Sequence, residues 1–133
     1  MKAEKKIKKY KTQSVHYFEN ALHFIEKGDA EKASEFLWGS MAQALKAVAA
    51  SRDIQLRSHR DVRDYAMELA RTLHDESIGH AFDKAQSLHS NFYESGLMLD
   101  DVVVGAERVK AAVTKLLNYI PASDEESQNR KER

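Results

Sequence analysis

The sequence predicts an all-α protein, folded as an up-and-down antiparallel bundle of about five helices. Its 133 residues include only five glycines and one proline, and long helices need few turn residues. Apolar residues recur at helical spacing in five segments, whereas no segment alternates with the period of a strand. We expect one domain over residues 1–120, followed by a disordered polar tail over residues 121–133.

The composition argues against several classes of function. Lysine and arginine together number 21, as do aspartate and glutamate, so global attraction to nucleic acid is not expected. The absence of cysteine excludes disulfides, thiolate zinc sites and cysteine nucleophiles. Neither a signal peptide nor a run of about 18 apolar residues is present, which predicts a cytoplasmic protein without a membrane partner.

The first helix is expected from about Lys5 to Lys27, where Gly28 ends it. Its apolar face carries Ile7, Tyr10, Val15, Phe18, Leu22 and Ile25. Six lysines and one glutamate lie among the first eleven residues. The lysines oppose the helix dipole, which favours a solvated and frayed helix end. The alternative is that they contact nucleic acid or an acidic partner.

The second helix is expected over residues 30–50, with Asp29 as its N-cap. Alanine and serine make up much of its inner face, and such small side chains indicate a very close helix neighbour. The turn before this helix is very short, so the first two helices are expected to be antiparallel neighbours. Trp38 lies at the margin of the apolar face, where it can pack at a seam between helices or stack on a base.

Three further helices complete the predicted bundle. They are expected over residues of about 59–73, 78–94 and 100–120, and a connection over residues 51–59 precedes them. Ser58 and Asp61 resemble a capping box for the first of the three. The residues expected to be buried on them are Val62, Tyr65, Ala66, Leu69, Ile78, Ala81, Phe82, Ala85, Leu88, Phe92, Val102, Ala106, Val109, Val113, Leu116, Leu117 and Ile120.

Three phrases of the chain carry a resemblance to a known family. They are GDAEKASEFLWGSMAQALKAVAA at residues 28–50, LRSHRDV at residues 56–62 and LHSNFYE at residues 88–94. Together they resemble the archaeal PaREP-type family over residues of about 15–117. The resemblance implies a HEPN-like helical bundle, often dimeric. HEPN relatives include ribonucleases, toxin components paired with small nucleotidyltransferases, and non-catalytic modules that bind RNA or nucleotides.

HEPN ribonucleases carry an arginine, then four to six intervening residues, and then a histidine at the start of a late helix. The histidine moves the ribose 2′-hydroxyl proton and the arginine holds the phosphate. Arg52 and His59 have this spacing, with six residues between them, but they lie in the connection after the second helix. The late helix offers only Lys84 and His89, and lysine lacks the guanidinium fork. The resemblance therefore favours a non-catalytic member.

The densest basic cluster inside the predicted fold lies just after the second helix. It consists of Arg52, Arg57, His59, Arg60 and Arg63. We predict that this cluster binds an anion, such as the phosphates of a nucleotide or of RNA. The alternative is a solvated surface whose charges pair locally, as helical spacing allows for Arg60 and Asp64.

The histidines outside this cluster carry weaker signals. His16 and His23 share one face of the first helix but lack further ligands, so no metal site and no cofactor are expected. His89 falls on the inward arc of the fourth helix. It can be a core or interface residue that forms a hydrogen bond, or it can serve as an acid or base.

We therefore predict a non-catalytic HEPN-like module that acts as a homodimer. It is expected to bind a partner protein of the nucleotidyltransferase type, RNA or a nucleotide through the arginine-rich region. The alternative is a HEPN-type ribonuclease or toxin component that acts through a histidine.

Overall fold

The computed structural model describes residues 2–90 and 99–121 and confirms the predicted all-α bundle. The described residues form five helices: α1 (Lys2–Glu26), α2 (Ala30–Ala50), α3 (His59–Thr72), α4 (Glu76–Ser90) and α6 (Leu99–Tyr119). The predicted polar tail after Pro121 lies outside the described residues, as do Phe92 and the predicted end of the fourth helix at Glu94.

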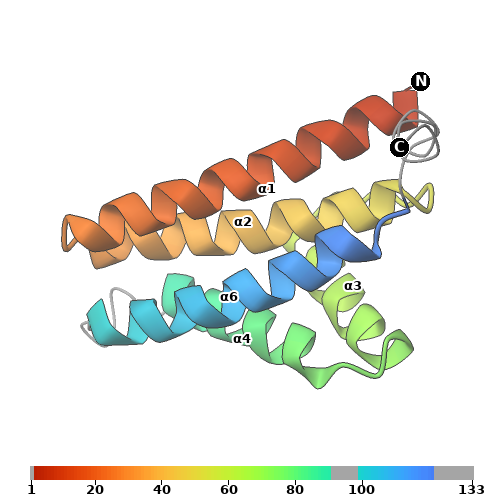
Figure 1. The fold of residues 1–133 in the computed structure, drawn as a ribbon. Helices are drawn as coiled ribbons and strands as arrows, with labels where there is room; N and C mark the ends of the chain where they lie inside the picture. The colour runs from red at the N-terminus through yellow and green to blue at the C-terminus, as the bar shows by residue number, and fades with distance from the viewer. Residues whose placement is uncertain (1, 91–98, 122–133) are drawn as a thin grey trace, which may run out of the picture.

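The central element of the bundle is α2, which contacts each of the other four helices. The helices α1, α2, α4 and α6 alternate in direction, and the shorter α3 lies at the end of the bundle where α2 finishes (Figure 1). Because α2 is surrounded, its buried residues extend beyond the single predicted face. The predicted face comprises Ala30, Ala33, Ser34, Phe36, Leu37, Trp38, Met41, Ala44, Leu45 and Val48. The residues buried outside it are Ser40, Ala42, Ala47 and Ala49.

The helices α1 and α2 approach each other closely, as the small side chains of α2 predict. The hydroxyl of Ser14 donates to the carbonyl of Ser40, and the hydroxyl of Ser40 donates to the carbonyl of Ser14, both at 2.8 Å. A Cβ atom on Gly39 would lie 3.1 Å from the ring of Tyr17. Since both serines are buried, the reciprocal bonds satisfy their hydroxyls inside the core.

Helical periodicity predicts which residues are buried more accurately than it predicts where the helices start. Among the described residues, every residue expected to be buried on the last three helices is buried except Leu117, which is half-buried. In contrast, α1, α4 and α6 begin at Lys2, Glu76 and Leu99, which is one to three residues earlier than expected. The lysine-rich start of the chain is therefore part of α1.

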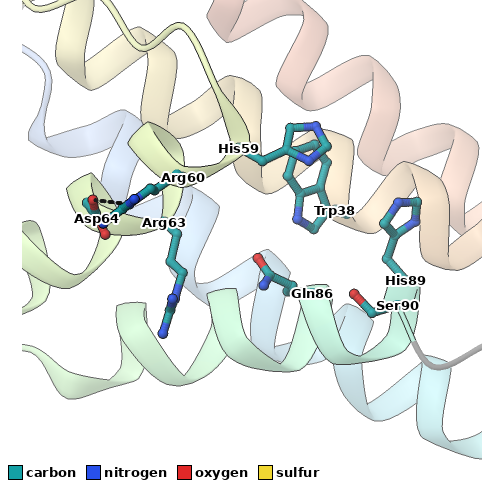
Figure 2. Close-up of a pocket in the computed structure, with 8 residues that line it drawn as sticks. All are labelled: Trp38, His59, Arg60, Arg63, Asp64, Gln86, His89 and Ser90. Carbon is teal, nitrogen blue, oxygen red and sulfur yellow. Dashed lines mark ion pairs between the residues drawn. The ribbon is translucent and has the colours of Figure 1, made fainter.

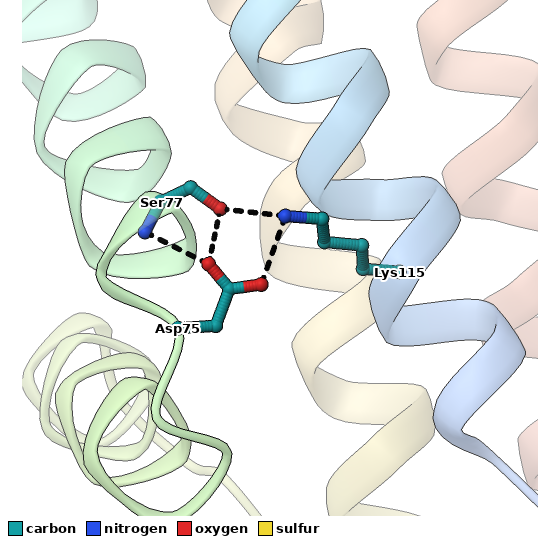
Figure 3. A network of polar contacts seen from close by, with 3 residues as sticks. All are labelled: Asp75, Ser77 and Lys115. Atoms are coloured by element: carbon teal, nitrogen blue, oxygen red, sulfur yellow. Dashed lines mark hydrogen bonds and ion pairs between the residues drawn. The ribbon is translucent and has the colours of Figure 1, made fainter.

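A polar network ties the start of α4 to α6 (Figure 3). Asp75 directly precedes α4, and its carboxylate accepts hydrogen bonds from the backbone and the hydroxyl of Ser77. The ammonium of Lys115 lies 2.9 Å from the same carboxylate and 3.0 Å from the hydroxyl of Ser77. Asp75 thus caps one helix and binds a cation on another.

Asp75→Ala is expected to lower the free energy of unfolding by about 1 kcal/mol at neutral pH, because it removes a helix cap. Hydrogen bonds from Lys115 and Ser77 hold the pKa of Asp75 below its ordinary value. This stabilisation is therefore full above the ordinary aspartate pKa of about 3.9 and is lost as the pH falls through the lower pKa of the folded state.

Urea unfolding of both proteins across this pH range checks the prediction. The difference between wild type and Asp75→Ala should be largest near neutrality and should narrow as the pH falls through the lowered pKa of Asp75. An equal difference at both ends of the range would contradict the proposed role of the charge.

Candidate binding cleft

Three of the five predicted site residues line one surface cleft with a volume of about 480 Å³. His59, Arg60 and Arg63 reach it from the first turns of α3 (Figure 2). The remaining lining residues come from α2, α3 and α4: Trp38, Asp64, Gln86, His89 and Ser90. The structure therefore joins part of the predicted basic cluster to residues that are distant in the sequence.

The start of α3 is held by the predicted capping box, with one difference. The hydroxyl of Ser58 accepts a hydrogen bond from the backbone of Asp61 at 3.1 Å. The carboxylate of Asp61 accepts from the backbone of Arg57, the residue before Ser58, at 2.9 Å. This bond, above all others, lowers the pKa of Asp61. The two capping interactions orient the helix turn that presents His59 and Arg60 to the cleft.

The indole of Trp38 contacts two imidazoles in the cleft. The ring centroid of His59 lies 4.5 Å from that of Trp38, with a 48° angle between the planes. His89 lies 5.8 Å away at 25° and stacks on the same indole. Trp38 is half-buried and both histidines are exposed. His89 thus lies at the solvent boundary, which corrects its expected place on the inward arc of α4.

The side chains around the cleft carry an excess of cationic groups. Arg60 pairs with Asp64 at 3.9 Å, and these side chains are 88% and 68% exposed. Such a long and solvated ion pair contributes little and leaves the guanidinium free to bind another anion. Arg63 is also exposed and forms no ion pair with another described residue. Two guanidiniums therefore line the cleft with one carboxylate.

Arg52 and Arg57 do not line the cleft. The guanidinium of Arg52 lies over the ring of Tyr119, 4.7 Å from its centroid, and donates to its hydroxyl. Arg57 donates to the side-chain oxygen of Gln55 at 3.3 Å. The spacing of Arg52 and His59 therefore does not bring the two together at the cleft, because Arg52 binds the C-terminal end of α6 instead.

Lys84, the other partner that the sequence offered to a histidine, is directed toward α6. A Cβ atom on Gly105 would lie 3.7 Å from its side chain, and Lys84 does not line the cleft. In contrast, Gln86 and Ser90 do line it and were missed. Their spacing of four residues places them on one face of α4, but no sequence signal indicates that this face meets the start of α3.

The described residues contain no group of three histidine or acidic side chains that could hold a metal ion. His16 and His23 are both exposed on α1. Within the same ranges, no helix combines the length and the apolar character needed to cross a membrane.

A comparison with models of protein families identifies the family of this chain. The model of the archaeal PaREP1/PaREP8 family matches residues 9–118. These residues include all of α2, α3 and α4 and every residue that lines the cleft. No curated protein matches the chain. Since the family model spans most of the sequence, the chain belongs to the archaeal PaREP1/PaREP8 family.

Proposed function

We propose that this protein is a non-catalytic module that binds single-stranded RNA or a nucleotide in the cleft between α2, α3 and α4. One observation carries the proposal: an accessible indole, two imidazoles and two guanidiniums line the same cleft. In this arrangement Trp38 provides a surface for a base, while Arg60 and Arg63 provide charge for a phosphate.

Each of these groups suits part of such a ligand. A base stacked on an aromatic side chain gains about 1–3 kcal/mol, and any base has the required π-face. The guanidinium fork forms paired, charge-assisted hydrogen bonds with phosphate oxygens. Gln86 and Ser90 add neutral donors and acceptors at the α4 side of the cleft, which suit the edge of an unpaired base.

The fluorescence of Trp38 provides a direct test, because it is the only tryptophan in the chain. Titration with a short single-stranded RNA, and separately with a nucleoside triphosphate, should change its emission in a saturable way. Replacement of both Arg60 and Arg63 by alanine should weaken this binding by about tenfold or more, since each charged hydrogen bond is worth roughly 1.5–3 kcal/mol.

A matched control separates a specific site from general charge attraction. Arg57→Ala combined with Arg71→Ala also removes two positive charges, but neither residue lines the cleft. This control should bind nearly as tightly as the wild type. Equal losses in the two double variants would reject the cleft as the site, and absence of any emission change would reject the proposed ligand class.

The resemblance to HEPN-like bundles supports a further part of the proposal, a homodimer as the working form of the protein. We also propose a cytoplasmic location. A nucleotidyltransferase-type protein partner is a competing occupant of the cleft. That partner becomes the better candidate if RNA and nucleotides leave the emission of Trp38 unchanged.

A second candidate function is RNA cleavage, which the positions of His59 and His89 favour. Both imidazoles are exposed and contact the same indole. One can take the 2′-hydroxyl proton as that oxygen attacks phosphorus, and the other can protonate the departing 5′-oxygen as its bond to phosphorus breaks. The products would be a 2′,3′-cyclic phosphate and a 5′-hydroxyl.

Incubation with RNA and with DNA of the same sequence distinguishes this candidate from simple binding. Cleavage of RNA alone, with loss in both His59→Ala and His89→Ala, would support catalysis. Intact RNA that nevertheless saturates the emission change of Trp38 would leave the non-catalytic module as the function.

A further inference from the structure

The basic residues of α1 are concentrated at one end of the bundle, where α2 also finishes (Figure 1). Six of the first eleven residues are lysines, whereas residues 12–26 include two glutamates and neither lysine nor arginine. The zero net charge of the chain therefore conceals a local excess of positive charge. Because lysines at the start of a helix oppose its dipole, they do not stabilise α1. Their presence points to a ligand of negative charge.

The packing of α1 against α2 places a lysine of α2 beside this end. A Cβ atom on Gly39 would lie 3.1 Å from the ring of Tyr17, so these two positions face each other across the helix pair. Positions seven residues apart recur on the same side of a helix, and the two helices are antiparallel. Tyr10 is seven residues before Tyr17 and Lys46 is seven after Gly39. Tyr10 and Lys46 therefore lie side by side.

Two lysines of α1 share the flank on which Lys46 lies. Lys6 is one turn before Tyr10, and Lys9 is three residues after Lys6, which makes the two lysines neighbours on the helix surface. Both are exposed, Lys46 is half-buried, and none of the three forms an ion pair with another described residue. We call Lys6, Lys9 and Lys46 the lysine flank.

The lysine flank continues the cleft toward the basic end of the bundle. Lys46 follows Trp38 by eight residues of α2, which places it about 12 Å farther along the helix axis and about 80° around it. Lys6 lies one turn beyond the level of Tyr10, or about 6 Å farther in the same direction. A ligand that leaves the cleft beside the indole therefore meets the lysine flank over an axial distance of about 18 Å.

We propose that the ligand of the cleft is a single strand of RNA several nucleotides long, whose sugar–phosphate backbone continues from Trp38 along the lysine flank. The inference rests on the proposed function and narrows its ligand from RNA or a nucleotide to an RNA strand. The cleft provides the stacking surface for a base. The ammonium groups hold phosphates, which position a strand without reading its sequence. A free nucleotide fills only the cleft and leaves the lysine flank unused.

The dissociation constants of a uridine dinucleotide and a uridine decanucleotide, measured from the emission of Trp38, test this path. Replacement of Lys6, Lys9 and Lys46 by alanine should weaken the binding of the decanucleotide by about tenfold or more. The same variant should bind the dinucleotide as the wild type does. For the decanucleotide it should also reduce the slope of log affinity against log salt concentration by about 2, because each phosphate contact contributes about 0.7.

Alanine at Lys8, Lys27 and Lys110 provides the matched control, because it removes the same charge from exposed positions outside the lysine flank. Lys8 lies about 200° around α1 from Lys6. This control should bind both RNAs nearly as tightly as the wild type. Since alanine favours helices, both triple variants should keep the circular dichroism of the wild type.

The outcomes separate this path from the cleft itself. A decanucleotide constant that is unchanged in the flank variant, or equal losses in the two triple variants, would overturn the path along the lysine flank and leave the cleft as a binding site. Absence of any emission change with either RNA in the wild type would reject the RNA ligand of the cleft as well.

Discussion

Phe82→Ala is expected to lower the free energy of unfolding by about 3–5 kcal/mol, which is the usual cost of removing a buried aromatic ring. Phe82 heads the fully buried side chains by volume. It lies on α4, which contacts α2, α3 and α6. A cavity at this position therefore weakens the attachment of the helix that carries Gln86, His89 and Ser90 to the rest of the bundle.

Urea unfolding measures this loss. The slope of the unfolding free energy against urea concentration should be the same in the wild type and in Phe82→Ala. Phe82→Leu provides the matched control, because it retains most of the apolar volume and should cost less than about 1.5 kcal/mol. A loss in Phe82→Ala as small as that of the leucine variant would show that the neighbouring helices close the cavity.

Trp38→Ala is expected to weaken the binding of single-stranded RNA by about 1–3 kcal/mol, or roughly 5- to 150-fold. The substitution removes the ring on which a base would stack. It also removes the surface that positions the imidazoles of His59 and His89. Anisotropy of a fluorescently labelled RNA measures the effect, since the variant has no tryptophan.

The control for this prediction separates stacking from phosphate binding. Trp38→Phe keeps an aromatic face and should recover most of the affinity. Competition by inorganic tripolyphosphate, which has no base, should be similar in all three proteins. If Trp38→Ala weakened the binding of tripolyphosphate as strongly as the binding of RNA, the indole would act by positioning the cationic groups rather than by stacking on a base.

The helices and most of the core follow from local information in the chain. The caps at Asp29 and Ser58 start helices where predicted, because each cap acts within three residues. The burial of Ile78, Phe82 and Leu88 follows from a repeat of three to four residues. Even the close contact of α1 with α2 was predictable, since only small side chains allow it.

The cleft depends on contacts that local patterns do not specify. Arg52 and His59 have the spacing of a known motif, yet Arg52 binds Tyr119, a residue 67 positions away. Helical periodicity places His89 on the inward arc of α4, yet the residue is exposed and stacks on Trp38. In both cases the position of the side chain depends on which helix lies beside it.

The sequence of this protein therefore determines the five helices of the described residues, their apolar faces and its membership of the archaeal PaREP1/PaREP8 family. The composition of the cleft was decided only by the tertiary structure, which places the end of α4 beside the start of α3 and against α2. The physical reason is one of range: capping and periodicity act over a few residues, whereas the meeting of Trp38, His59 and His89 requires the whole bundle to pack.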